Sequence, residues 1–107
     1  MATLKEIQRF ADQVAREFHP QKIILFGSYA YGKPNEGSDV DLLVIMRHKG
    51  HPAYKSVEIR GKVRASFPMD LLVRSPAKVR ERLRLDDWFM QDIIEKGKVL
   101  YEAPKSL

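Results

Sequence analysis

Two acidic residues and a Gly-Ser pair carry the chemistry that this sequence suggests. Gly27 and Ser28 directly follow an apolar run at 23–26. Ten residues later, Asp39 and Asp41 stand at the head of a second apolar run. In a strand, residues two apart point to the same side, so the two carboxylates face one spot. Paired carboxylates bind hard cations, and a Gly-Ser turn accommodates phosphate, so this combination is typical of metal-assisted phosphoryl chemistry.

Asp70 is the third candidate in this group. It lies inside the otherwise apolar run 67–73, where an uncompensated charge is costly. Three clustered carboxylates repel one another, and divalent cations relieve that repulsion. The competing interpretation is that Asp39 and Asp41 are solvated turn residues at a strand entrance. The five apolar residues after Asp41 favour the functional interpretation.

This layout resembles the signature of the DNA polymerase beta-like nucleotidyltransferase superfamily, especially its minimal members. The turn, the spacing and the acid pair occur in the order of that signature, and the resemblance spans nearly the whole chain. It implies that Asp39, Asp41 and Asp70 are catalytic and hold two Mg²⁺ ions, or Mn²⁺ in their place. It also implies that the nucleotide is bound by Gly27, Ser28, Lys33 and Ser38.

The resemblance also implies a division of labour. One ion carries the triphosphate, and the other activates an acceptor hydroxyl that attacks the α-phosphorus and expels pyrophosphate. Asp70 would serve the acceptor side and help to deprotonate the hydroxyl. One position departs from the family pattern: Tyr31 stands where relatives often have Arg, and it supplies no charge to the triphosphate. Lys33 is the candidate that compensates.

Minimal chains that look like this one are typically encoded beside HEPN-domain proteins. In such pairs the HEPN protein is an RNase toxin, and the transferase is the antitoxin that adenylylates a tyrosine of its partner. The resemblance therefore implies an ATP-dependent protein adenylyltransferase in a type VII-like toxin–antitoxin pair, forming a hetero-oligomer. Two alternatives stay open: nucleotidyl transfer to a small molecule such as an antibiotic, and a non-catalytic antitoxin that occludes its partner.

Length and composition limit the number of domains, the possible chemistry and the expected location of the protein. A length of 107 residues predicts one domain, spanning 1–107. The absence of Cys excludes disulfides and thiolate chemistry. No signal-peptide core and no membrane-spanning run is present, so we expect a cytoplasmic protein without a membrane partner. The net charge of +5 fits a nucleotide partner as well as plain solubility, and direct nucleic-acid binding is not expected.

Periodicity predicts an α/β fold, a single small domain with a short mixed sheet flanked by helices, as in nucleotidyltransferases. The expected helices are 3–18, a short one from 29–31, 53–65, one opened by Pro76 that breaks near 86–87, and 88–96, which ends at Gly97. The expected strands are 22–26, 40–46, 67–73 and 98–101.

The remaining candidates have ordinary explanations. Residues 27–33 match the start of a Walker A loop, but Pro34 stands where that loop needs Ser or Thr. His48 and His51 are expected to be surface loop residues. The basic residues of the helix opened by Pro76 are expected to be solvated. Core packing is the expectation for the apolar cluster Trp88, Phe89, Ile93 and Ile94, with exposure of part of that cluster for docking as the alternative.

Overall fold

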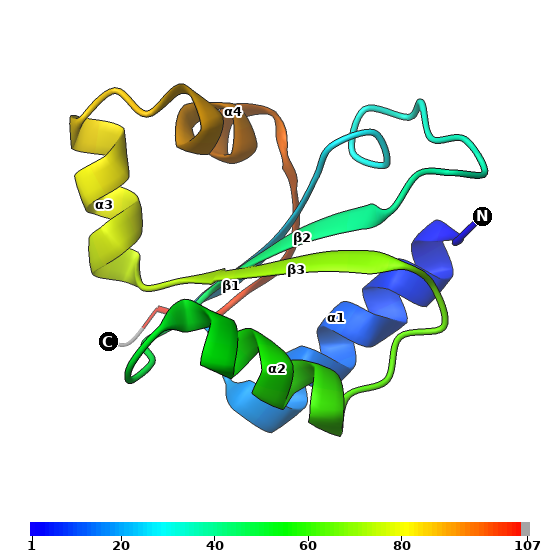
Figure 1. The fold of residues 1–107 in the computed structure, drawn as a ribbon, viewed down its shortest axis with the longest axis horizontal. Helices are drawn as coiled ribbons and strands as arrows, with labels where there is room; N and C mark the ends of the chain where they lie inside the picture. The colour runs from blue at the N-terminus through cyan, green and yellow to red at the C-terminus, as the bar shows by residue number, and fades with distance from the viewer. Residues whose placement is uncertain (106–107) are drawn as a thin grey trace.

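The computed structural model describes residues 1–105. Four helices and four strands follow one another in the order α1 (Leu4–Phe18), β1 (Lys22–Phe26), β2 (Val40–Ile45), α2 (Pro52–Lys62), β3 (Met69–Arg74), α3 (Pro76–Arg84), α4 (Trp88–Lys96) and β4 (Lys98–Glu102). The sheet lies between two pairs of helices (Figure 1). The predicted α/β class, with helices flanking a short mixed sheet, is confirmed.

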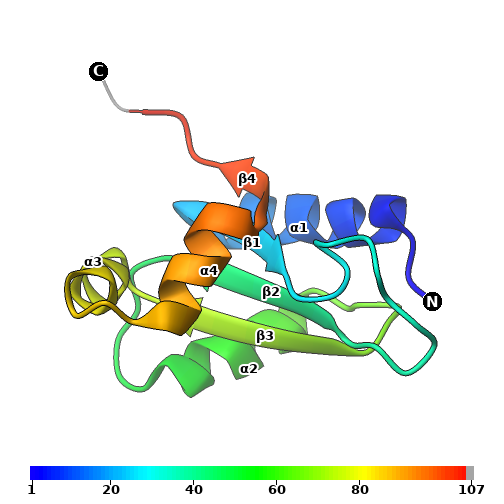
Figure 2. The ribbon, with the colours of Figure 1, turned by 90° about the horizontal axis from the view of Figure 1, so that it is seen from above.

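The four strands form one sheet in the order β3-β2-β1-β4. β1 pairs antiparallel with β2 and with β4, whereas β2 and β3 are parallel. A parallel pair needs a crossover connection, and α2 supplies it. β3 therefore lies at one edge of the sheet and β2 lies inside it, as the view from above also shows (Figure 2).

Side chains alternate between two cores, one on each face of the sheet. In β2, Leu42 and Val44 pack with α1 and α2, while Leu43 and Ile45 pack with α3 and α4. All four side chains are buried because both faces are covered. This explains why the strand reads as a continuous apolar run instead of an alternating one.

The first helix illustrates how local signals set the boundaries. Thr3 caps α1 through a capping box with Glu6: each side chain accepts a hydrogen bond from the backbone N–H of the other residue. His19 ends the helix in the left-handed region at φ 50°, just before Pro20. The helix predicted over 3–18 thus forms within one residue of its expected bounds.

Three expectations differ from the structure. Residues 28–32 form turns instead of a short helix. α2 ends at Lys62, three residues before the predicted end. β3 begins at Met69, because Pro68 offers no N–H to the ladder and Phe67 instead packs edge-to-face on Phe10, with ring centroids 5.9 Å apart.

Helix α4 exposes more apolar surface than its sequence predicts. Ile93 is buried, but Trp88 is 75% exposed and Phe89 is 45% exposed. Of the predicted core cluster, Ile93 packs as expected, whereas Trp88, Phe89 and Ile94 form the exposed part that the alternative interpretation allowed. No helix within residues 1–105 is long and apolar enough to cross a membrane.

Candidate active site

The acids meet through the parallel pairing of β2 and β3. Asp41 and Asp70 are directly opposite one another in that register, and Phe26 of β1 is opposite Asp41 on its other side. Leu43, two residues after Asp41, packs under α3 and α4, so all three side chains lie on that face of the sheet. Asp39 precedes the first residue of β2 and lies beside the same row.

Asp41 is the half-buried member of the group, whereas Asp39 and Asp70 are exposed. Burial raises the pKa of the Asp41 carboxyl, and the negative charges of Asp70 and Asp39 raise it further. No Lys, Arg or His within residues 1–105 forms an ion pair with any of these carboxylates. Within residues 1–105, therefore, no positively charged side chain neutralises these carboxylates.

The donor set suits a hard divalent cation, because Mg²⁺ and Mn²⁺ prefer carboxylate oxygens. With the side chains as they stand, however, the described residues contain no group of three His, Cys, Asp or Glu that could hold a metal ion. The backbone register brings Asp41 and Asp70 together, and exposed side chains such as that of Asp70 change rotamer on a picosecond to nanosecond scale. The residues therefore fit a metal by their chemistry and backbone placement, without a preformed cage.

The turn after β1 approaches the acids closely. Gly27 has φ 74°, and a Cβ added to it would overlap Oδ2 of Asp41. Its carbonyl accepts hydrogen bonds from the N–H groups of Ala30 and Tyr31, at 3.0 and 3.2 Å. This is one helix-like turn that does not continue, since Gly32 also takes a positive φ of 75°. The predicted short helix fails here for that reason.

Ser28 lies half-buried in this turn. The alternative interpretation of Ser28 as a helix N-cap does not hold, because no helix begins there. In this turn the Gly27 carbonyl accepts from the N–H groups of Ala30 and Tyr31. The N–H groups of Ser28 and Tyr29, by contrast, donate to no backbone carbonyl within residues 1–105. Free backbone donors beside a close-approach glycine are suited to an anion such as phosphate.

Two further predicted nucleotide-binding residues are placed differently. The Ser38 hydroxyl accepts from the N–H of Asn35 at 3.0 Å and donates to Asn35 Oδ1 at 3.3 Å, so it closes its own turn. Lys33 is exposed, and its backbone N–H donates to the Ser28 carbonyl at 3.0 Å. Lys33 therefore belongs to the Gly27 turn, and its side chain is free to reach an anion from there.

Tyr31 has a partner that the sequence did not reveal. Its hydroxyl donates to Asp92 Oδ2 of α4 at 2.7 Å, which links the Gly27 turn to that helix. This hydrogen bond is the main reason that the pKa of Tyr31 is raised, and the Asp92 charge adds to it. Asp92 also pairs with Lys96 at 3.5 Å. Tyr31, at the position where the resemblance led us to expect Arg, is thus used for a structural contact.

An aromatic contact completes this end of the sheet. The rings of Phe26 and Phe89 pack edge-to-face, with centroids 5.7 Å apart and an interplanar angle of 85°. Phe26 neighbours Asp41 in the sheet, so α4 covers the row next to the acids without covering Asp70. Nothing in the local sequence signals this contact, because it depends on how α4 crosses the sheet.

Comparisons with known proteins identify the family and the fold. A family model described as "Nucleotidyltransferase domain" matches residues 7–103. A search of curated proteins finds no match. Among solved structures, the crystal structure of a candidate nucleotidyltransferase from Sulfolobus solfataricus matches with a TM-score of 0.64 and 18% sequence identity, over 92% of this chain and 79% of that chain. At this identity the structural likeness shows a shared fold.

Proposed function

Because the chain belongs to the nucleotidyltransferase domain family, we propose that it transfers AMP from ATP to a tyrosine of a HEPN-domain RNase, and thereby acts as the antitoxin of that toxin. The observation that carries the transferase part is the row formed by Asp41 and Asp70 on adjacent strands, with Asp39 beside it and the Gly27 turn against it. The partner is inferred from the resemblance to minimal transferases that accompany HEPN proteins.

Asp39, Asp41 and Asp70 would hold the Mg²⁺ or Mn²⁺ ions that this family of reactions uses. The ions, when bound, neutralise phosphate charge and lower the pKa of an acceptor hydroxyl. The chain itself supplies the negative charge that attracts them, and the raised pKa of Asp41 reflects how unfavourable that charge is without a cation.

The other residues bind and orient the nucleotide. The N–H groups of Ser28 and Tyr29 and the Ser28 hydroxyl are donors for phosphate oxygens, and Gly27 permits the close approach. In the transfer, a bond forms between the tyrosine oxygen and the α-phosphorus, and the bond to the pyrophosphate breaks. In this proposal the carboxylate of Asp70, which is exposed, receives the phenol proton.

A protein acceptor is consistent with the exposure of the site. Asp39 and Asp70 are both exposed, so a side chain presented by another molecule has access to them. A tyrosine on a folded partner brings its own positioning surface, which orients the hydroxyl for attack.

The experiment is mass spectrometry of a co-expressed HEPN partner after incubation with ATP and Mg²⁺. We expect an added adenylate on a tyrosine with the wild-type chain and none with Asp70→Asn. The amide keeps the shape of the carboxylate but binds Mg²⁺ poorly and cannot accept a proton. Glu36→Gln removes one exposed acid from the loop between β1 and β2 and should leave transfer intact. Transfer by Asp70→Asn at the wild-type rate would refute the assignment.

A second function, occlusion of the partner without catalysis, is favoured by one observation. The Tyr31 hydroxyl is held by Asp92, so this position brings no charge to a triphosphate. If the wild-type chain silences its partner without modifying it, and Asp70→Asn silences it equally well, occlusion replaces the enzymatic proposal.

A further inference from the structure

A groove of about 760 Å³ runs along the outer edge of β3, between the first turns of α2 and α3. Its lining includes residues 71–73, two residues with hydroxyl groups (Ser56 and Ser75) and several basic or imidazole side chains, and no Asp or Glu lines it. The basic and imidazole residues are His48, His51, Arg74 and Lys78. The acid row is absent from this lining, so the groove is separate from the candidate active site.

The edge of β3 presents free donors but occupied acceptors. Met69, Leu71 and Val73 point their backbone groups away from β2, because the ladder uses the alternate residues on either side. The three outward carbonyls accept from side chains: Met69 O from Arg60 at 2.7 Å, Leu71 O from Ser56 at 2.9 Å, and Val73 O from Arg74 at 2.7 Å.

The N–H groups of Leu71 and Val73 point the same way as these carbonyls, away from β2, and both residues line the groove. No acceptor for them is recorded within residues 1–105. An added β-strand would need both donors and acceptors from this edge, and the acceptors are already used. The edge is therefore suited to a ligand that brings acceptors alone.

His48 adds a buried polar atom to the same groove. Its Nδ1 is buried and has no hydrogen-bond partner among the described residues, and it is the one side-chain atom of residues 1–105 found in that condition. His48 lies in the loop after β2 at intermediate exposure, as predicted, but this one atom is shielded from solvent. Buried polar atoms normally have partners, so an orphan that lines a groove indicates a missing ligand or water.

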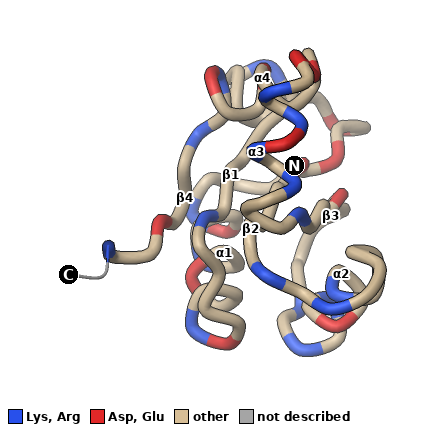
Figure 3. Tube along the Cα trace, turned by 90° about the vertical axis from the view of Figure 1, so that its left-hand side faces the viewer, with Lys and Arg blue, Asp and Glu red and all other residues tan. Residues whose placement is uncertain are grey.

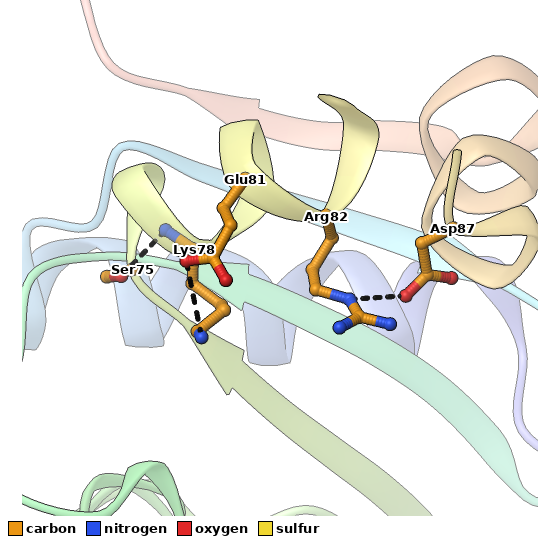
Figure 4. A network of polar contacts seen from close by, with 5 residues as sticks. All are labelled: Ser75, Lys78, Glu81, Arg82 and Asp87. Atoms are coloured by element: carbon orange, nitrogen blue, oxygen red, sulfur yellow. Dashed lines mark hydrogen bonds and ion pairs between the residues drawn. The ribbon is translucent and has the colours of Figure 1, made fainter. Parts of the chain in front are cut away.

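Lys78 brings a flexible positive charge to the rim. It lies on the first turn of α3, whose N-cap Ser75 accepts from the Lys78 N–H at 3.1 Å. Figure 4 shows the Lys78 side chain extending from α3 toward β3, with Glu81 beside it at 3.5 Å. Arg82, by contrast, is held by Asp87 at 2.6 Å. Lys78 can therefore turn to a ligand more easily than Arg82 can.

We propose that this groove binds an acidic segment of the acceptor protein, an inference that rests on the proposed function. Carboxylates are pure acceptors when ionised, which matches the free N–H groups of Leu71 and Val73 and the charge of Lys78. Lys and Arg positions are spread over the loop after β2, α2 and α3 on the side of the molecule seen in Figure 3. Since β3 also carries Asp70, a partner seated here is held beside the candidate active site.

The test uses a labelled oligoglutamate peptide and a matched oligoglutamine peptide, without nucleotide or metal. We expect fluorescence anisotropy to detect binding of the first peptide and not of the second. The amide resonances of Leu71 and Val73 should shift on addition of oligoglutamate. Lys78→Gln should weaken binding roughly two- to fivefold, the range of one exposed charge pair.

Arg80→Gln is the matched control, because Arg80 lies on the same helix, is equally charged and does not line the groove. Equal losses in the two variants would overturn the proposal in favour of general attraction to a basic chain. Absence of peptide binding would also overturn it, as would full displacement of the peptide by an equal concentration of inorganic phosphate, which would indicate a small-anion site. Adenylate transfer to the partner is measured in a separate assay. The groove proposal can therefore fail while the proposed transferase function holds, and the reverse.

Discussion

Replacing Asp41 with Asn should stabilise the metal-free protein at neutral pH. The folded state raises the pKa of Asp41, chiefly through burial and then through the charges of Asp70 and Asp39. A carboxyl with a raised pKa contributes stability that is fully present below its unfolded pKa and is lost as the pH rises through the folded value. Asn carries no charge at any pH, so its advantage grows as the pH rises above the ordinary value of 3.8.

The register gives the part of the gain that comes from charge repulsion, which adds to the effect of burial. Asp41 and Asp70 are opposite one another on neighbouring strands, and strands are spaced about 5 Å apart. Two unit charges at about 5 Å repel by roughly 0.8 kcal/mol in water and roughly 3 kcal/mol at an effective dielectric constant of 20. Since Asp70 is exposed, the lower end applies, and we expect a gain of about 1 kcal/mol. For a domain of this size that is a rise in Tm of about 4–8 °C.

The assay is thermal unfolding followed by circular dichroism between pH 4 and pH 8, in the presence of a chelator. Glu36→Gln is the control, because it removes the same charge from an exposed loop position and reports the effect of net charge alone. The gain of Asp41→Asn should be present at neutral pH and fade toward pH 4. A variant that is no more stable than wild type at neutral pH, or equally more stable at every pH, would refute the reasoning.

Further outcomes concern the turn after β1. Gly27→Ala should cost more stability than Gly32→Ala, because both have positive φ but only at Gly27 would the new Cβ force the Asp41 carboxylate to move. Urea unfolding of the two variants decides this, and equal losses would contradict it. Ser28→Ala should weaken ATP binding roughly ten- to a hundredfold, as measured by calorimetry, because one hydrogen bond to phosphate is lost. Its Tm should stay unchanged, since Ser28 caps no helix. A lower Tm with intact ATP binding would contradict this prediction. Asp92→Asn should lower the pKa of Tyr31, as ultraviolet titration of tyrosinate would report, and an unchanged pKa would exclude the hydrogen bond in solution.

Strand periodicity predicts that Asp39 and Asp41 face one side, although in the structure Asp39 precedes β2, which begins at Val40. Side chains two apart share a side in any strand, so the inference needed no knowledge of the fold. The involvement of Asp70 followed from its position inside an apolar run. Its register opposite Asp41 could not be predicted, because it depends on a parallel pairing that α2 creates by crossing from β2 to β3.

The errors have tertiary causes. Gly27 and Gly32 both adopt positive φ, which turns the chain back before a helix can extend, and the sequence alone does not say which glycines do so. Phe89 reads as a core residue, but α4 crosses the sheet at an angle that leaves nearly half of it exposed. The β3 groove was missed altogether, because its walls come from segments that are distant in the chain.

The acids are divided between an edge strand and an interior strand, and this has a dynamic consequence. Asp41 lies in β2, which has a neighbour on each side, and Asp39 directly precedes that strand, while Asp70 lies on β3, which has one neighbour. Edge elements open in local fluctuations that leave the rest of a domain folded. Such an opening would carry Asp70 away and keep the other two acids in place. A ligand that bridges both strands binds the closed form alone and shifts the population toward it. The rate at which β3 amides exchange with solvent would then report occupancy of the site without any turnover.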